Sequence, residues 1–383
     1  MIYKDFKDIK LSALGMGCMR LPVDENKEID MAKTAEMVEY AISHGVNYFD
    51  TAWGYHGGKS ETAMGEILSK YPRESYYLAS KFPGYDLKNM TKVEEIFEEQ
   101  LRKCKVDYFD FYLFHNVCEL NIDAYLDESY GIFEFLKKQL ENGRIRHLGF
   151  STHGTLETME RFLKAYGNYM EFCQIQLNWL DWEFQKANEK VSLLDDWGIP
   201  VWVMEPLRGG SLCRLQSYYA NRMREWVRPE STQAEVAFRF IQSIDSVTVT
   251  LSGMSNFEQL RENIEIFETD DPLDENECMV LYTIADEMVR PKTLPCTSCR
   301  YCTEYCPMEL DIPRIIELYN EHNFSDGGFI APMALRSLSG TGETKNKKNK
   351  TPSACIGCRS CEAVCPQNIK ISEMMADFAS KIR

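Results

Sequence analysis

Eight of the 14 cysteines in this 383-residue chain fall in two short runs with the same spacing. The first run, CTSCRYCTEYCP, begins at Cys296, and the second, CIGCRSCEAVCP, begins at Cys355. In each run, gaps of two, two and three residues separate the cysteines, and a proline follows the last one. Thiolates are soft metal ligands, and three of them on a tight loop can converge on one face of a small inorganic core. The spacing therefore predicts metal-centred chemistry.

The other chemistries of cysteine fit these runs less well. A zinc site usually takes its ligands as two separated pairs, so a third Cys-x-x-Cys step followed by Cys-Pro is surplus to it. A disulfide framework is not expected, because the N-terminal segment has no apolar signal core and a reducing compartment is expected. Zinc and free thiols stay open as alternatives. The scattered cysteines are expected to be small core residues; they are Cys18, Cys104, Cys118, Cys173, Cys213 and Cys278.

The last ninety or so residues resemble bacterial two-cluster ferredoxins, whose ligand run is C-x2-C-x2-C-x3-C-P. The resemblance implies a domain over residues 291–383 that holds two [4Fe-4S] clusters. In that family the fourth cysteine of each run binds the cluster of the other run. The implied ligand sets are Cys296, Cys299, Cys302 and Cys365 for one cluster, and Cys355, Cys358, Cys361 and Cys306 for the other.

An internal repeat supports this exchange of ligands. The segments CPMELDIPRII, from Cys306, and CPQNIKISEMM, from Cys365, align without a gap. Each predicts a cluster loop followed by a short helix, opened by Pro313 in one copy and Ser372 in the other. Residues 324–354, between the halves, are expected to be an inserted loop. Its basic run KNKKNK, residues 345–350, reads as a solvated loop, with the docking of an acidic protein partner as the alternative.

Residues 1–290 predict a different architecture. Short apolar or aromatic segments begin at residues 14, 47, 76, 109, 145, 173, 200 and 246, and helical patterns lie between them. Eight such units predict a (β/α)8 TIM barrel, an α/β fold whose chemistry sits where the strands end. An open doubly wound sheet is the rival, but no G-x-G-x-x-G motif follows the first strand. The smaller C-terminal domain is expected to be α+β and ferredoxin-like.

Four residues with acid–base chemistry fall at the ends of three neighbouring predicted strands. They are Asp50 and Tyr55 in FDTAWGYH, Lys81 in ASKF and His115 in LFHN. We expect the charge of Lys81 to lower the pKa of the Tyr55 phenol, and Asp50 to hold Lys81. His115 could donate a hydrogen bond to a carbonyl oxygen. Taken singly, each residue fits a surface or packing role better than a catalytic one; their coincidence at matching strand ends predicts a catalytic site.

These segments resemble the aldo-keto reductase superfamily in sequence and in order: LGMGCMRLP, FDTAWGYHGGKSE, SKF, LFHN, EPLRGG and LSGMSNFEQLRENIE. The resemblance implies an NADP(H)-dependent oxidoreductase that reduces a small-molecule carbonyl, or oxidises the alcohol. Tyr55 is then the proton donor, and a reduced nicotinamide delivers hydride.

The same resemblance implies which residues contact the nucleotide. Ser151 and Gln176 match positions that hold the nicotinamide amide, whereas Thr152 and Met204 depart from the usual Asn and Tyr. Gly253 stands where many members carry a phosphate-binding Lys. Four further residues match the adenosine end of the nucleotide: Ser255, Gln259, Glu262 and Asn263. The full implied set is Ser151, Thr152, Gln176, Met204, Leu207, Arg208, Ser255, Gln259, Glu262 and Asn263.

Composition restricts the partners. A formal net charge of −16 argues against a nucleic-acid partner. No apolar run is long enough for a transmembrane helix, and the N-terminus has no apolar signal core, so a cytoplasmic protein is expected.

Three hypotheses account for clusters on a hydride-transferring enzyme. The clusters are structural or regulatory; they exchange electrons with the barrel site through a flavin or a redox protein partner; or the chain is mainly an electron-carrier subunit.

Overall fold

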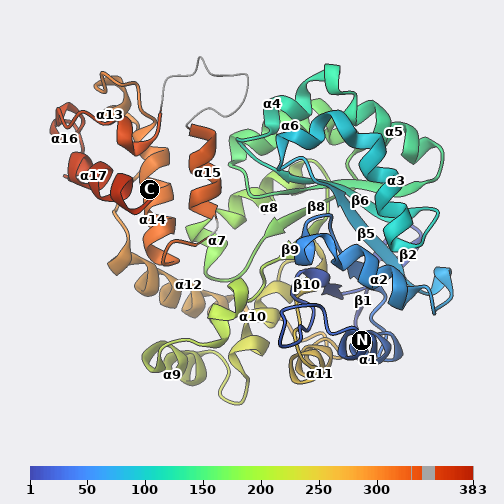
Figure 1. Ribbon diagram of the computed structural model, residues 1–383. Helices are drawn as coiled ribbons and strands as arrows, with labels where there is room; N and C mark the ends of the chain where they lie inside the picture. Colours follow the sequence, from blue (N-terminus) through green and yellow to red (C-terminus); the bar gives the residue numbers. More distant parts are fainter. Residues whose placement is uncertain (329, 339–349, 383) are drawn as a thin grey trace. The chain divides into compact units, whose positions relative to one another are not determined.

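The computed structural model describes residues 1–328, 330–338 and 350–382, which divide into two units, Met1–Tyr282 and Thr283–Arg383 (Figure 1). The expected domain boundary after residue 290 lies just beyond helix α12 (Glu275–Val289).

Eight parallel strands close into a barrel in the first unit, which confirms the predicted fold (Figure 1). Strand β10 pairs with β3 and so completes the ring, with Thr250 opposite Leu14. The strands are β3 (Leu14–Gly17), β4 (Tyr48–Asp50), β5 (Tyr77–Phe82), β6 (Phe109–Val117), β7 (Ile145–Thr152), β8 (Phe172–Gln176), β9 (Val201–Met204) and β10 (Val247–Ser252).

A hairpin that the sequence did not predict precedes the barrel. Strands β1 (Tyr3–Phe6) and β2 (Ile9–Ser12) pair antiparallel, with Lys7 in the turn at φ 53°. Phe6 packs edge-on against Trp202, with ring centroids 5.1 Å apart, in an aromatic-rich cluster at the barrel interior. The hairpin therefore covers apolar surface at one end of the barrel, so the opposite end, where the strands finish, carries the chemistry.

Amphipathic helices surround the barrel. The predicted stripe of Val93, Ile96, Phe97 and Leu101 on α3 is buried. No helix among the described residues is long and apolar enough to cross a bilayer. The helices of the first unit are α1 (Met31–Ser43), α2 (Ser60–Leu68), α3 (Val93–Cys104), α4 (Ile122–Leu126), α5 (Ile132–Glu141), α6 (Leu156–Tyr166), α7 (Asp181–Phe184), α8 (Ala187–Asp196), α9 (Ser217–Trp226), α10 (Gln233–Gln242), α11 (Phe257–Ile266) and most of α12.

The second unit repeats one backbone pattern. Left-handed residues recur at matching positions 59 residues apart: Ser298 with Gly357, Arg300 with Arg359, and Glu309 with Asn368. Each half ends in the predicted helix, and the apolar residues of both helices share one core. The described helices are α13 (Tyr301–Glu304), α14 (Ile312–Phe324), α15 (Ile330–Leu338), α16 (Ser360–Ala363) and α17 (Ile371–Lys381).

Helix α15 corrects the expectation that residues 324–354 form a loop throughout. Ala331, Ala334 and Leu335 are buried in the core of this unit, so tertiary packing stabilises a helix where Gly and Ser nearby suggested loop. Residues 345–349 of the basic run lie outside the described residues. Within the part of this unit that the structure describes, helices occur without strands, although an α+β arrangement was expected.

The cysteines outside the two runs agree with the prediction that they are core residues. Cys18, Cys104, Cys118, Cys173 and Cys278 are buried, and Cys213 is half-buried.

Candidate active site and cluster sites

A buried ion pair lies at the ends of strands β4 and β5. Lys81 is fully buried, and its Nζ donates to Asp50 Oδ1 at 2.5 Å and to the backbone oxygen of Thr51 at 2.8 Å. Burial raises the pKa of Asp50, and the charge of Lys81 opposes that rise. The structure thus brings together two of the predicted catalytic residues, in the arrangement expected of them.

Tyr55 follows β4 in a tight loop and lies against this pair. The Nζ of Lys81 is 5.2 Å from the centre of the Tyr55 ring. The loop bends through left-handed conformations at His56 (φ 50°) and Gly57 (φ 63°). The side chain of His56 is itself fixed, because its Nε2 accepts a hydrogen bond from the Leu21 backbone N–H at 3.1 Å. The chain thereby fixes the phenol close to Lys81.

His115 faces Tyr55 from strand β6. Their ring centroids are 6.1 Å apart, in an edge-to-face arrangement. The register between β6 and β7 breaks between Phe114 and Val117, and bulges of this kind re-aim side chains near active sites. The buried Nδ1 of His115 has no hydrogen-bond partner among the described residues. Burial holds the pKa of His115 well below its ordinary value, so the ring is neutral near pH 7.

The pKa of Tyr55 moves in the direction opposite to the expected one. Burial, and then the negative charge of Asp50, raise it well above its ordinary value. The charge of Lys81 does not reverse the rise, because that ammonium is already paired with Asp50. Tyr55 is therefore a protonated phenol across the neutral range, a hydrogen-bond donor beside a neutral imidazole.

The residues matched to the nicotinamide amide lie at the ends of β7 and β8. The Oγ of Ser151 accepts from the Asn116 backbone N–H at 2.8 Å. The hydroxyl of Thr152 donates to the Val117 carbonyl at 2.7 Å, so it fastens β7 to β6. The amide of Gln176 donates to Asp181 Oδ2 at 2.7 Å. Gln176 pairs with Met204 in the β8–β9 register, which places Met204 at the same edge of the barrel.

Asp181, which no sequence motif pointed to, organises the segment after β9. This buried carboxylate accepts from Asn178 Nδ2 at 2.8 Å and from the Nε of Arg208 at 3.1 Å. Arg208 has φ 46°, and the backbone oxygen of Leu207 accepts from the Gly210 N–H at 2.8 Å. Leu207 and Arg208 thus belong to a tight turn anchored on Asp181.

The residues matched to the adenosine end lie at and along α11. The backbone N–H of Ser255 donates to Gln259 Oε1 at 2.8 Å, so these two residues lie together. Glu262 accepts from Thr232 Oγ1 at 2.7 Å. Asn263 is buried and donates to Ser252 Oγ at 2.9 Å. Glu262 and Asn263 therefore contact neighbouring elements of the barrel in this structure.

Two further residues, Tyr85 and Glu205, lie near the predicted active site but were not predicted to belong to it. The Tyr85 ring lies 5.1 Å from His115, and a side chain at Gly54 would collide with its hydroxyl. Glu205 has φ 58°, and burial raises the pKa of its carboxyl. Tyr85 belongs to no motif, and Glu205 opens the segment EPLRGG without a predicted role, so only their position in space identifies them.

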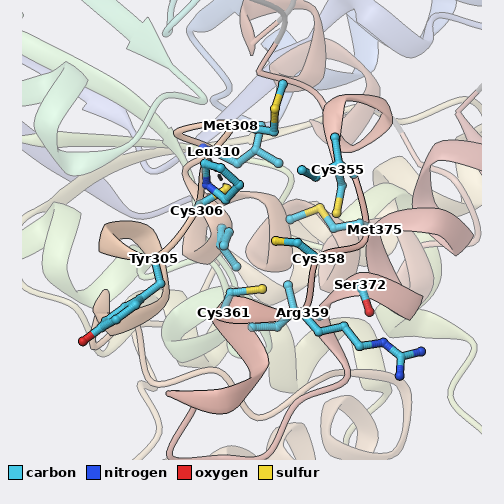
Figure 2. Close-up of a pocket in the computed structure, with 14 residues that line it drawn as sticks. Tyr305, Cys306, Met308, Leu310, Cys355, Cys358, Arg359, Cys361, Ser372 and Met375 are labelled. Atoms are coloured by element: carbon cyan, nitrogen blue, oxygen red, sulfur yellow. Dashed lines mark hydrogen bonds between the residues drawn. The ribbon is translucent and has the colours of Figure 1, made fainter.

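The eight cysteines of the two runs line two pockets in the second unit, and each pocket mixes the runs. Figure 2 shows the sulfur atoms of Cys306, Cys355, Cys358 and Cys361 around one shared space. The second pocket is lined by Cys296, Cys299, Cys302 and Cys365, with Ile316, Ile369 and Ile371 among the apolar residues. In both pockets, three cysteines come from one run and the fourth from the other run.

The chemistry of the two pockets fits an iron–sulfur cluster better than a single metal ion. Among the described residues, no three His, Cys, Asp or Glu side chains lie close enough to bind one ion. A cluster spreads its thiolates around a larger body. Backbone N–H groups of Leu310 and Gly357 donate to the sulfurs of Cys306 and Cys355, both at 3.5 Å. Such bonds stabilise negative charge on sulfur.

Comparison with protein families finds two matches in the chain. Residues 13–281 match the model described as the aldo/keto reductase family. Residues 295–369 match the model described as a 4Fe-4S dicluster domain.

Individual relatives match the barrel. The chain is 26% identical over 287 residues to the uncharacterized oxidoreductase YqkF of Bacillus subtilis, a match that covers 67% of this chain and 88% of the relative. It is also 26% identical over 301 residues to the NADH-specific methylglyoxal reductase of Escherichia coli, covering 67% and 90%.

Solved structures share the fold. The holo form of the aldo-keto reductase AKR11C1 from Bacillus halodurans superposes with a TM-score of 0.62 at 24% identity, covering 74% of this chain and 96% of that one. An aldo-keto reductase from Klebsiella pneumoniae in complex with NADPH gives a TM-score of 0.58 at 19% identity, with the same coverage of 74% and 96%.

Proposed function

Because this chain belongs to the aldo/keto reductase family and also carries a 4Fe-4S dicluster domain, we propose that it reduces a carbonyl substrate with a nicotinamide cofactor, or oxidises the corresponding alcohol. The observation that carries the proposal is the set of contacts among Asp50, Lys81, Tyr55 and His115. Lys81 is paired with Asp50 at 2.5 Å, and the Tyr55 ring lies 5.2 Å from Lys81 Nζ and 6.1 Å from the ring of His115.

Tyr55 is the proton donor in this proposal. Its raised pKa keeps the phenol protonated, and a carbonyl oxygen that gains negative charge during reduction is basic enough to take that proton. The adjacent ammonium of Lys81 stabilises the phenolate left behind. The neutral ring of His115 donates a hydrogen bond to the same oxygen and so orients the substrate.

The nucleotide would lie along the ends of β7 to β10. When bound, a reduced nicotinamide supplies the hydride that attacks the carbonyl carbon. Ser151 and Gln176 would hold its amide, Met204 would pack against its ring, and Ser255 and Gln259 would meet the adenosine end. NADP(H) is the proposed cofactor, although the Escherichia coli relative is named NADH-specific.

The decisive experiment compares carbonyl reduction by the whole protein and by Tyr55→Phe, with NADPH and with NADH. Loss of a positioned general acid lowers rates by about 10²- to 10⁴-fold. The panel of carbonyls begins with methylglyoxal, the compound in the name of the Escherichia coli relative. Tyr77→Phe is the matched control, because Tyr77 begins β5, at the end of the barrel opposite the site. Full activity in Tyr55→Phe would refute the assignment.

The second unit would hold two [4Fe-4S] clusters, one in each pocket. The proposed ligands are the four cysteines that line each pocket, three from one run and one from the other. When bound, each cluster accepts or gives one electron. Iron and sulfide analysis of anaerobically purified protein should give about eight irons per chain, the content of two four-iron clusters.

Electron exchange through the clusters is a second candidate function, favoured by the exposure of Cys299 and Cys358. An exposed ligand brings a cluster close to the protein surface, where a redox protein partner can approach. A flavin would be needed to couple hydride chemistry to one-electron chemistry. A yellow chromophore released on acid treatment, together with reduction of a one-electron dye by NADPH, would support this function. Dye reduction that persists after cluster removal would count against it.

A further inference from the structure

An arginine at the mouth of the barrel lies across the ends of three strands. Arg20 follows β3, and its backbone oxygen accepts from Ser255 Oγ at 2.9 Å, which ties it to the segment after β10. Its side chain runs directly over Gly253. A Cβ added at Gly253 would lie 3.2 Å from Arg20 Cβ and 3.3 Å from its Cγ and Cδ. The alkyl part of the arginine thus fills the space that a larger residue at 253 would need.

The charged end of Arg20 reaches the segment after β9. A Cβ added at Gly209 would lie 3.3 Å from Arg20 Nη2 and 3.9 Å from Glu205 Oε2. The charge of Arg20 lowers the pKa of Glu205, against the larger effect of burial, so the two groups interact through space. No hydrogen bond or ion pair of the Arg20 guanidinium is found within the described ranges of the chain. The guanidinium is therefore positioned by its surroundings while its donors stay available.

We propose that Arg20 binds a phosphate group of the dinucleotide, an inference that rests on the proposed nicotinamide-dependent function. A guanidinium presents paired donors that match phosphate oxygens, which makes arginine suited to this anion. The guanidinium lies beside Gly209, the alkyl part of Arg20 lies over Gly253, and residues without side chains let a bulky anion approach the backbone. The dinucleotide offers two sources of phosphate: the pyrophosphate, and the 2′-phosphate that only NADP(H) carries.

A competing account is that Arg20 serves only to balance Glu205. The two accounts predict opposite signs for the neutralisation of Glu205. If Arg20 binds phosphate, Glu205→Gln removes a negative charge beside the anion and strengthens dinucleotide binding. If Arg20 only balances Glu205, Arg20→Ala leaves the half-buried carboxylate of Glu205 unmatched, Glu205→Gln leaves an exposed guanidinium, and neither strengthens binding.

The test measures dinucleotide binding by calorimetry on the whole, cluster-containing protein under anaerobic conditions, so that the readout does not depend on turnover. Arg20→Ala should weaken NADPH binding by about ten- to a hundredfold, the range for a hydrogen bond to a charged group. Equal weakening for NADH assigns the pyrophosphate; weakening for NADPH alone assigns the 2′-phosphate. Arg161→Gln, which removes an exposed arginine of α6, is the charge-matched control and should bind as the unaltered protein does.

A positive charge placed at a neighbouring position should restore dinucleotide binding to the Arg20→Ala variant. In Arg20→Ala/Gly253→Lys, the lysine starts where the arginine chain passed and should recover most of the lost affinity. Arg20→Ala that binds both dinucleotides as tightly as the unaltered protein overturns the inference and leaves the proposed function standing. An unaltered protein that binds neither dinucleotide overturns both.

Discussion

The barrel site and the cluster pockets are held in place by different means. In the barrel, Asp50 and Lys81 are buried and satisfy each other, so protein groups alone fix the geometry. In the second unit, eight thiols line two pockets, and two of them, Cys299 and Cys358, are exposed. The geometry of the barrel site therefore depends on the packing of protein groups, whereas that of the cluster pockets depends on the inorganic group that their thiols bind.

Removal of the clusters should give the largest effect and the clearest separation of the two units. We expect an iron chelator with a mild oxidant to unfold residues 283–383, because their small core is shared by only a few short helices. Barrel helices should persist, and Tyr55-dependent carbonyl reduction should continue. Far-ultraviolet circular dichroism and hydrogen exchange of α14 and α17 measure the first effect. Simultaneous melting of both units would show that the barrel also depends on the clusters.

Substitution of Lys81 tests whether packing alone holds the barrel site. Lys81→Met leaves Asp50 as a buried, uncompensated carboxylate, and should cost about 3–5 kcal/mol of unfolding free energy. Without Lys81, the pKa of Asp50 in the folded protein is raised further, so the folded state favours the protonated carboxyl. This variant is therefore most stable at a pH below the pKa of Asp50 in the unfolded chain. It loses stability as the pH rises through the pKa of Asp50 in the folded protein.

Urea unfolding at low and high pH measures this loss. Asp50→Asn/Lys81→Met should recover much of the stability, because no buried charge remains. Lys164→Met, from an exposed pair with Glu160, is the control and should change stability little. A Lys81→Met variant as stable as the unaltered protein at high pH would contradict a buried ion pair.

Exchange of ligands between the two halves predicts a specific pattern of damage. Cys365→Ser should remove the cluster bound by Cys296, Cys299 and Cys302, and so about half of the iron. Its electron paramagnetic resonance spectrum should match that of Cys296→Ser and differ from that of Cys355→Ser. Cys213→Ser, in the barrel, should retain all iron. A Cys365→Ser spectrum like that of Cys355→Ser would mean that each run binds its own cluster.

The smallest expected effect is the response of the barrel chemistry to pH. The pKa of Tyr55 is raised and that of His115 is lowered, so neither group titrates in the neutral range. The rate of carbonyl reduction at saturating cofactor should stay nearly constant from about pH 6 to 9. Alcohol oxidation needs the phenolate as base, and its rate should rise with pH across that range. A reduction rate that halves near neutral pH would place an ionising group in the proton path.

The sequence predicted those parts of the molecule whose signals are local. Each barrel strand is an apolar segment, and the helix α3 carries a regular stripe from Val93 to Leu101. The acid–base residues were proposed because they lie at or near the ends of neighbouring strands. Hairpin β1–β2 was missed because its strands are short and mixed in charge, and α15 because packing outweighs the Gly and Ser around it.

The contacts that the sequence did not predict arise where the fold brings side chains together in space. Asp181 lies among Gln176, Asn178 and Arg208, and Arg20 meets Gly253 from more than 200 residues away along the chain. The predicted direction of the shift in the Tyr55 pKa was wrong for the same reason. The strength of burial, and the pairing that occupies Lys81, become visible only when the side chains are placed.

The mixing of runs in the two pockets has a consequence for how the protein is made. A ribosome releases the chain from its N-terminus, so the barrel is complete while both pockets still lack thiols. One pocket receives its fourth sulfur at Cys361 and the other only at Cys365, long after the last barrel strand has been synthesised. Iron loading therefore comes after the barrel has been synthesised, and a nascent chain halted between the two runs would hold neither metal centre.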